Sequence, residues 1–317
     1  PSPCRAASPS SAHAGPPPRG ASRTWSGGLA YEGEWAGAAR HGEGVLEWPD
    51  GSRYEGQFAH DAREGVGTFV EPGGSSYSGA WHRDARHGEG TQQSAQGEVY
   101  AGQWVAGARH GEAEEVLPGG ACYVGQFWRS ARHGLGRLTC ADGSSYEGLF
   151  LDGQRHGEGT ERGPDGAAFE GQFVEGAPRG WGRRTWPDGG TLEGCWLGDK
   201  AHGAGLMRKG QGHTTYAGQY MLGLQHGEGV EATEGGDMYV GQFACGKRSG
   251  LGCLFEAGGA MYKGRFEDGA QSGMGTRTWP DGSELAGEFA GGRPHGRCAY
   301  VDTEGVRWAT EWRDGTE

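Results

Sequence analysis

The sequence has few of the features that mark a membrane-spanning or nucleic-acid-binding chain. Hydrophobic residues make up only 34% of its 317 residues, and no apolar run is long enough to cross a bilayer as a helix. Acidic residues outnumber basic ones, 41 to 29, which gives a formal net charge of -12. Because nucleic acid attracts basic surfaces, this balance argues against nucleic acid as a partner.

Motifs of catalysis and metal binding are also scarce. The chain contains no phosphate-binding Gly-x-x-x-x-Gly-Lys-Ser/Thr and no zinc-protease His-Glu-x-x-His. The seven cysteines do not have the spacing of a metal site, and an odd, unpatterned set is typical of a reducing compartment. We therefore expect a cytoplasmic protein that is not an enzyme, with no catalytic residue, no cofactor and no metal.

What the sequence does contain is a short repeat. An aromatic-x-Gly-x-aromatic pentad returns every 23 residues, and His-Gly-x-Gly and a turn such as Pro-Asp-Gly follow it. A constant period of this size indicates a repeat array whose units pack mainly on their neighbours. The pentads begin at Tyr31, Tyr54, Tyr77, Tyr100, Tyr123, Tyr146, Phe169, Leu192, Tyr216, Tyr239, Tyr262, Leu285 and Trp308.

The pattern inside one repeat predicts strands. Polar residues alternate with the aromatic and glycine positions of the pentad, as in a strand with one packed face and one wet face. Turn signals of Pro, Asp and Gly close each unit, so each unit is predicted to be one β-hairpin. No glycine-free stretch has helical periodicity. The predicted fold is all-β, an elongated antiparallel β-hairpin solenoid or rod with essentially no helix.

Glycine at fixed positions needs a physical reason, because it normally weakens a strand. We expect the first glycine of His-Gly-x-Gly to lie beneath an aromatic ring of a neighbouring strand, where a Cβ atom would not fit. Rings and glycines would then interleave along the array. The structural positions predicted on this basis are Tyr31, Gly33, Trp35, Gly42, Tyr54, Gly56, Phe58, Gly65, Tyr123, Gly125, Phe127 and Gly134.

The period also sets the boundaries. Residues 1–20 are rich in Pro, Ser and Ala and are predicted to be disordered, while residues 21–317 form the array. A single extra residue near 213–215 falls in a turn, where an insertion is tolerated. The sequence ends inside a repeat, so we expect it to be part of a longer protein.

These residues resemble MORN repeats, whose pattern is approximately Tyr-x-Gly-x-Trp, then His-Gly-x-Gly and Asp-Gly. The resemblance covers about residues 21–317 and implies an elongated antiparallel β-solenoid that serves as a scaffold at membranes or on the cytoskeleton. In some relatives the array is attached to an enzyme, a phosphatidylinositol phosphate kinase or a SET-domain methyltransferase. Some copies depart from the pattern: the first aromatic is replaced by Leu192 and Leu285, and the histidine is replaced by Glu64, Arg179, Ser249 and Ser272. We expect looser packing or a bend there.

One column of basic residues is a candidate binding edge. An arginine precedes the histidine position in six consecutive copies: Arg40, Arg63, Arg86, Arg109, Arg132 and Arg155. Arginine matches phosphate geometry, so this column could contact anionic phospholipid or an acidic partner. Glu43, Glu89, Glu112 and Glu158 follow three residues later and are expected to neutralise much of its charge. The repeated histidines should lie about 10 Å apart, too far to share a metal ion.

Three functions remain open at this stage. The first is a non-catalytic scaffold or adaptor that binds partner proteins near membrane or cytoskeleton and also self-associates through a mild apolar patch at Val124, Leu149, Cys195 and Val240. The second is a membrane adaptor that binds anionic phospholipid. The third is the regulatory repeat region of a larger enzyme of the two kinds named above.

Overall fold

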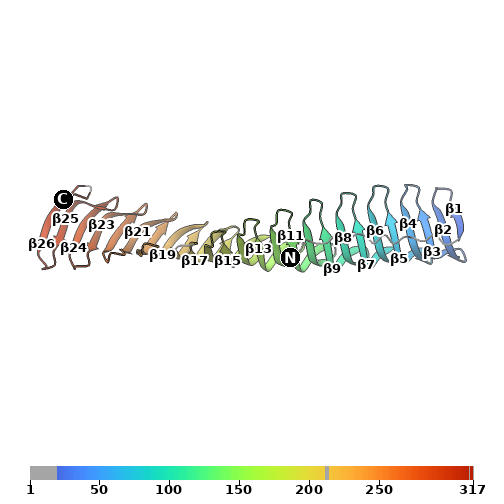
Figure 1. The fold of residues 1–317 in the computed structure, drawn as a ribbon, viewed down its shortest axis with the longest axis horizontal. Helices are drawn as coiled ribbons and strands as arrows, with labels where there is room; N and C mark the ends of the chain where they lie inside the picture. Colours follow the sequence, from blue (N-terminus) through green and yellow to red (C-terminus); the bar gives the residue numbers. More distant parts are fainter. Residues whose placement is uncertain (1–19, 211–213, 314, 317) are drawn as a thin grey trace. The chain divides into compact units, whose positions relative to one another are not determined.

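The computed structural model describes residues 20–210, 214–313, 315 and 316. These residues form 26 β-strands and no helix, which confirms the all-β prediction (Figure 1). No helix among them is long and apolar enough to cross a membrane. The strands fall into two compact units, unit 1 (Pro1–Pro164) and unit 2 (Asp165–Glu317). The disorder predicted for residues 1–20 falls, apart from Gly20, outside the described residues, and so does part of the insertion near 213–215.

Unit 1 is an antiparallel sheet in which each strand pairs with the next one along the chain. One repeat supplies one hairpin, as the sequence predicted. The strands are β1 (Ala21–Thr24), β2 (Ala30–Ala36), β3 (Ala39–Glu47), β4 (Arg53–Ala59), β5 (Ala62–Val70), β6 (Ser76–His82), β7 (Ala85–Gln93), β8 (Val99–Val105), β9 (Ala108–Val116), β10 (Cys122–Trp128), β11 (Ala131–Thr139), β12 (Ser145–Leu151) and β13 (Gln154–Arg162).

Unit 2 has the same sequential antiparallel pairing. Its strands are β14 (Ala168–Val174), β15 (Ala177–Thr185), β16 (Thr191–Leu197), β17 (Lys200–Arg208), β18 (Thr215–Met221), β19 (Leu224–Ala232), β20 (Met238–Ala244), β21 (Lys247–Phe255), β22 (Met261–Glu267), β23 (Ala270–Thr278), β24 (Glu284–Ala290), β25 (Arg293–Val301) and β26 (Arg307–Trp312).

Two kinds of turn join the strands. Within a hairpin, β4 and β5 are joined by His60 and Asp61, whose φ angles of 49° and 68° belong to the left-handed turns that match strand twist. Between hairpins the turn is longer. There the Gly51 N–H donates to the Trp48 carbonyl and the Trp48 N–H donates to the Ser52 carbonyl, both at 2.9 Å.

The first glycine of His-Gly-x-Gly lies in a β-bulge. In the hairpin β2–β3, Gly33 pairs with Gly44 but Trp35 pairs with Arg40, so β3 carries two more residues than β2 between these pairs. Gly42 lies among the extra residues with a φ of 59°, which side-chain-bearing residues rarely adopt. The same glycine has a φ between 59° and 91° in all twelve complete copies. The bulge therefore explains why this column is always glycine.

The ring contact falls on the second glycine instead. A Cβ atom added to Gly44 would lie 2.4–2.6 Å from atoms of the Tyr31 side chain, whereas one added to Gly42 would meet the Glu34 side chain. The predicted role is therefore wrong for Gly42, Gly65 and Gly134. The pentad glycines Gly33, Gly56 and Gly125 do lie in a close approach, because an added Cβ would be 2.4–2.5 Å from the Cα of the opposite glycine.

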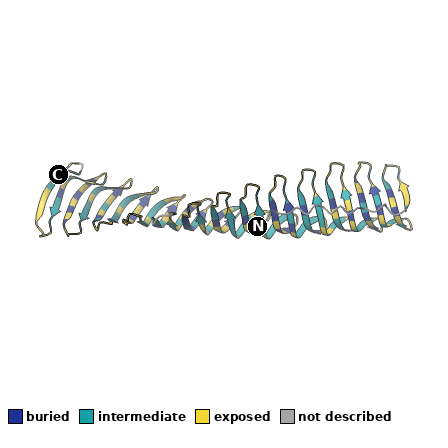
Figure 2. Ribbon diagram, viewed as in Figure 1, coloured by how far each residue is buried: buried dark blue, intermediate teal, exposed yellow. Residues whose placement is uncertain are grey.

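Aromatic rings form a continuous column along unit 1, and in unit 2 the column is interrupted at Leu192. The Tyr31 ring meets Trp35 of its own hairpin edge-on at 5.0 Å and Phe58 of the next hairpin at 5.2 Å. The Tyr31 hydroxyl donates to the Glu34 carbonyl at 2.9 Å, a group that the bulge leaves without a partner in the β2–β3 ladder. The column appears as the buried bands along the strands in Figure 2. Each ring thus covers backbone and also satisfies its polar groups.

The close approach of paired glycines leads to a stability prediction. A Cβ atom at Gly148 would lie 2.6 Å from the Cα of Gly159, so the strands must move apart to accept it. We expect Gly148→Ala to lower the free energy of unfolding by about 2–3 kcal/mol in urea titrations of the full chain. The control is Gly73→Ala, whose added Cβ has no atom within 4 Å and should change stability by less than about 0.5 kcal/mol. Equal effects of the two variants would contradict this explanation.

Alkaline pH should unfold the tyrosine column. Burial raises the pKa of Tyr31, Tyr77, Tyr100 and Tyr123 from 10.0 to about 12. Between these values the folded state keeps protons that the unfolded state releases. Stability is therefore complete below pH 10 and falls as the pH rises toward 12. Tyrosinate absorbance and circular dichroism should change together over this range. Ionisation near pH 10 with the strands intact would show that the tyrosine hydroxyl groups are not shielded from solvent.

The copy that begins at Leu285 keeps its packing by a second substitution. Cys298 replaces the second glycine of that hairpin, and its side chain fills the space beside the smaller leucine, with Leu285 0% and Cys298 6% exposed. The Cys298 sulfur lies 3.8 Å from the carbonyl oxygens of Glu288 and His295. These are the counterparts of the two carbonyl groups that the Tyr31 hydroxyl approaches. The looser packing expected at this copy is therefore wrong.

In the copy that begins at Leu192, a ring from the next hairpin occupies the space beside the smaller leucine. A Cβ atom on its second glycine, Gly205, would lie 3.1 Å from the ring of Tyr220 on β18. Tyr220 stands where every other copy has Trp or Phe, and Leu192 remains only 4% exposed. Among the described residues the Tyr220 hydroxyl has no hydrogen-bond partner. The neighbouring ring compensates here too, and the expected looser packing is again not found.

Restoring tyrosine and glycine at positions 285 and 298 of the last complete copy should reveal the energetic coupling between these two positions. Leu285→Tyr alone places a ring against the Cys298 side chain, and Cys298→Gly alone leaves a void and two carbonyl groups without a donor. Each single variant should lose about 1–3 kcal/mol of unfolding free energy. The double variant should recover most of the loss, with a coupling of about 1–3 kcal/mol in thermal or urea unfolding. Strictly additive losses would show that the two positions are independent.

Candidate interaction surface

The first arginines of the predicted binding edge lie on the aromatic face of unit 1. The Arg40 guanidinium is 5.4 Å from the Phe58 ring, and its Nε atom lies 3.3 Å from the Asp61 carboxylate. Arg63 lies 3.1 Å from Asp84 in the same way. Both side chains are only 19% exposed. These arginines therefore join one hairpin to the turn of the next, and their charge is already paired.

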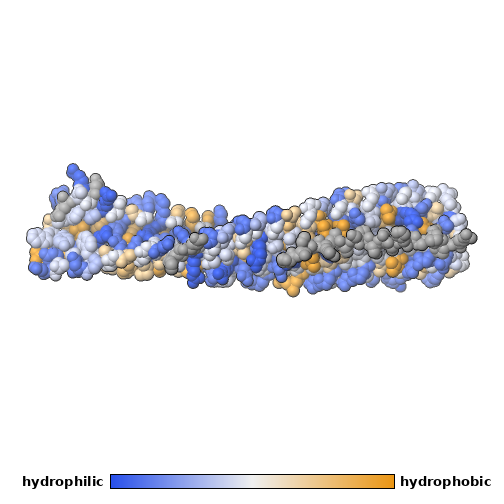
Figure 3. Space-filling view, in the orientation of Figure 1, coloured by the Kyte–Doolittle hydropathy of each residue, from blue (hydrophilic) through white to orange (hydrophobic). Residues whose placement is uncertain are grey.

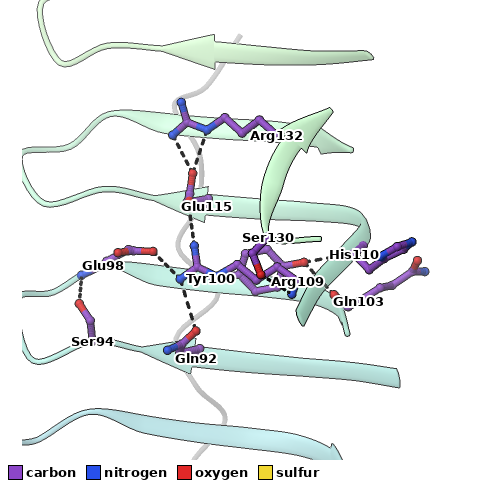
Figure 4. A network of polar contacts seen from close by, with 10 residues as sticks. All are labelled: Gln92, Ser94, Glu98, Tyr100, Gln103, Arg109, His110, Glu115, Ser130 and Arg132. Atoms are coloured by element: carbon purple, nitrogen blue, oxygen red, sulfur yellow. Dashed lines mark hydrogen bonds and ion pairs between the residues drawn. The ribbon is translucent and has the colours of Figure 1, made fainter. Parts of the chain in front are cut away.

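The next arginines share a buried carboxylate (Figure 4). Glu115 is 6% exposed and accepts hydrogen bonds from Arg109 at 2.7 Å and from Arg132 at 2.6 Å. Arg109 also donates to Glu98 at 2.5 Å, and its guanidinium lies 4.8 Å from the Tyr100 ring. A carboxylate held by two guanidinium groups from consecutive repeats fixes the spacing of the hairpins.

The remaining two members are also engaged. The Arg86 guanidinium lies 5.1 Å from the Tyr77 ring and 5.2 Å from the Trp104 ring, and burial lowers its pKa. Arg155 forms an ion pair with Glu161. The structure therefore brings the predicted column together on one face, but between rings and carboxylates rather than on a free edge.

The carboxylates expected to neutralise the arginines lie elsewhere. Glu43 accepts a hydrogen bond from Gln57 at 3.0 Å, and Glu112 accepts one from Gln126 at 2.9 Å. Both bonds join exposed side chains on the opposite side of the sheet. Among the described contacts, Glu43 and Glu112 therefore do not pair with the arginines whose charge they were expected to neutralise.

Sequence reasoning missed the carboxylates that do pair with this column. Glu115 and Glu231 occupy a column that holds Leu46 in the first copy and Leu254 in the tenth. Glu231 lies 2.8 Å from Arg248, an arginine equivalent to the predicted column. Both glutamates lie six residues after the arginine position of their own copy, and this even spacing, which places two side chains on the same face of a strand, was the signal that could have identified these partners.

Removing the shared charge should destabilise unit 1. Glu115→Gln leaves Arg109 and Arg132 facing a neutral amide in a largely buried place. We expect a loss of roughly 3 kcal/mol of unfolding free energy. The control is Glu89→Gln, an exposed residue with no ion pair among the described residues, which should be near neutral. If both variants unfold at the same urea concentration, the network does not hold the repeats together.

One tripeptide suggestive of chemistry lies in a structural position. His82-Arg83-Asp84 has the letters of a kinase catalytic tripeptide, but Arg83 and Asp84 form the turn between β6 and β7, with φ angles of 49° and 65°. His82 contacts the Glu64 carboxylate at 2.9 Å. In the described part of the chain no three His, Cys, Asp or Glu residues are grouped as metal ligands would be.

The outer face, the side of each sheet away from the rings, carries the variable positions of the repeat. In unit 1 it exposes Val66 (63%), Val124 (49%), Leu135 (65%) and Leu149 (39%). Leu135 and Leu149 are directly paired across β11 and β12. These apolar side chains do not contribute to the ring column, and they are exposed among the described residues of unit 1.

The outer face of unit 2 also exposes apolar side chains. It exposes Val230 (38%), Met238 (39%), Val240 (40%), Leu251 (69%) and Phe255 (39%) on the neighbouring strands β19, β20 and β21. Figure 3 shows apolar side chains gathered in separate areas among hydrophilic ones on one face of the molecule. Exposed apolar groups on neighbouring strands are typical of interaction surfaces.

Comparison with protein families gives a match over most of the chain. The model described as MORN repeat matches twelve segments: residues 31–53, 54–76, 77–99, 100–122, 123–145, 146–168, 169–191, 193–214, 216–238, 239–259, 262–284 and 286–307. These segments start at or within one residue of the pentads, so the period read from the sequence is confirmed. A search of curated proteins gives no match.

Similarity to solved structures is weak. The TCP domain of Drosophila melanogaster SAS-4, solved with a proline-rich motif of Ana2, is 11% identical with a TM-score of 0.32, covering 56% of this chain and 90% of that one. The TCP10 domain of Danio rerio CPAP is 12% identical with a TM-score of 0.25, covering 77% and 98%. A virginiamycin B lyase from Staphylococcus aureus has a TM-score of 0.14 at 11% identity, covering 85% and 83%.

Proposed function

Because this chain belongs to the MORN repeat family, we propose that it is a non-catalytic scaffold whose outer faces bind other proteins. The supporting observation is that the two sides of each sheet differ: one is packed and the other exposes apolar residues. The aromatic face is filled by rings, glycines and paired arginines, while exposed apolar residues such as Leu135 and Leu251 lie on the outer face. A sheet face with such exposed residues is suited to protein contacts.

The contacts of the arginine column favour a protein partner over anionic phospholipid. A phosphate group would have to displace Asp61, Asp84 or Glu115 from guanidinium groups that already lie within 3.3 Å of them. Liposome flotation with and without phosphoinositide separates the two functions. Flotation that depends on phosphoinositide and is lost in Arg40→Gln together with Arg63→Gln would favour the lipid adaptor.

The scaffold proposal is tested by affinity capture with outer-face variants. The full wild-type chain is immobilised and compared with Leu135→Glu and with a control, Thr91→Glu, which changes the same face of unit 1 at a residue that is not apolar. We expect wild type and control to retain a shared set of proteins from cell extract and Leu135→Glu to lose members of it. Identical sets for all three chains, or no retained protein, would reject the proposal.

A further inference from the structure

We infer that two copies of this chain pair through the outer faces of β17–β21 in unit 2, with Glu193 of one copy opposite Lys263 of the other. The inference rests on the proposed scaffold function and names one partner for it. It is carried by a row of apolar side chains, by the charges at the two ends of that row, and by the symmetry that these two features share.

The row is continuous because its members are direct neighbours in the sheet. Leu206 pairs with Ala217, Ala217 with Val230, Val230 with Val240, and Val240 with Cys253. Val230 and Val240 are 38% and 40% exposed, and Ala217 is also exposed. Five strands spaced about 4.8 Å apart make this row about 20 Å long.

A second row on the same face widens the apolar surface. Ala232 pairs with Met238, Met238 with Phe255, and Phe255 with Met261. Met238 and Phe255 are each 39% exposed. They lie two residues along their strands from Val240 and Cys253, so their side chains point to the same side of the sheet. Met238 and Phe255 therefore add exposed apolar surface beside one half of the first row, on β20 and β21.

Side chains of opposite charge lie at the two ends of the first row. At one end Glu193 on β16 pairs in register with Leu206, and at the other end Lys263 on β22 pairs in register with Cys253. Lys263 is exposed and has no ion pair within the described part of the chain. Glu193 has only a 3.5 Å contact with Arg183 and is 36% exposed. Lys263 is therefore available to a partner, and the exposed side of Glu193 can meet a second cation while the Arg183 contact is kept.

The order of these residues is self-complementary. Along the row, an acidic residue is followed by five apolar residues and then by a basic residue. The centre of the row is Val230 on β19. A twofold axis parallel to β19 would reverse the order in the second copy. Glu193 would then face Lys263 of the other copy at both ends, with apolar side chains between. A parallel arrangement would place like charges together, so the pattern favours the antiparallel pair.

Sedimentation equilibrium of the full chain tests the surface. We expect a monomer–dimer equilibrium whose Kd rises at least about tenfold in Val240→Glu. The matched control is Val124→Glu, which makes the same change at the same position of a repeat in unit 1, where Val124 is 49% exposed. It should leave the Kd unchanged. Circular dichroism confirms folding, and Val230→Glu replaces Val240→Glu if the latter unfolds.

Charge exchange tests the antiparallel order. Glu193→Lys and Lys263→Glu should each weaken the dimer by roughly fivefold, because each creates like-charge contacts. An equimolar mixture of the two single variants should dimerise about as well as wild type, since both end contacts are then between opposite charges. Absence of rescue in the mixture would reject this arrangement.

The remaining outcomes separate the inference from the scaffold proposal. A chain that stays monomeric at every concentration, or that responds equally to Val240→Glu and Val124→Glu, overturns the inference. If such a chain still captures proteins through Leu135, the scaffold proposal stands without a dimer. If it does neither, both fail.

Discussion

The fit of a tyrosine ring against a glycine is the constraint on which each unit depends. The Tyr31 ring occupies the place that a Cβ of Gly44 would take, and its hydroxyl donates to the carbonyl that the neighbouring bulge leaves unpaired. One side chain thus covers the backbone and satisfies it. Because both roles need tyrosine and glycine at fixed spacing, a chain with 68 glycines and 34% hydrophobic residues can still bury a ring in most of its repeats.

The sequence predicts the hairpins well because alternation and turn residues act locally. It does not reveal which of two repeated glycines a ring covers. Gly42 and Gly44 differ only because the pairing of β2 with β3 shifts by two residues between them, and a shift of register is a property of two strands together. The paired change to Leu285 and Cys298 did carry a signal, since an altered ring and an altered glycine occur in the same copy.

The arginine column provides one contact that the sequence could have predicted and one that it could not. Successive side chains along a strand alternate between its faces, so a carboxylate three residues after Arg109 must lie on the other side of the sheet. This could have been deduced from the sequence. The acceptor is Glu115, six residues on and therefore on the same face. By contrast, the contact of Arg40 with Asp61 depends on how the turn of one hairpin meets its predecessor, which no local pattern encodes.

Which residues the outer face can carry depends on the contacts that the aromatic face already makes. Since rings, glycines and paired arginines hold the hairpins together, outward positions can change without loss of the fold. Solubility alone favours charged residues there, as at Glu32 and Glu55 in the first copies. Val230 and Val240 are 38% and 40% exposed, so each presents apolar surface to water. A registered apolar row that ends in opposite charges is therefore better explained by what it meets outside the chain than by the stability of the sheet that carries it.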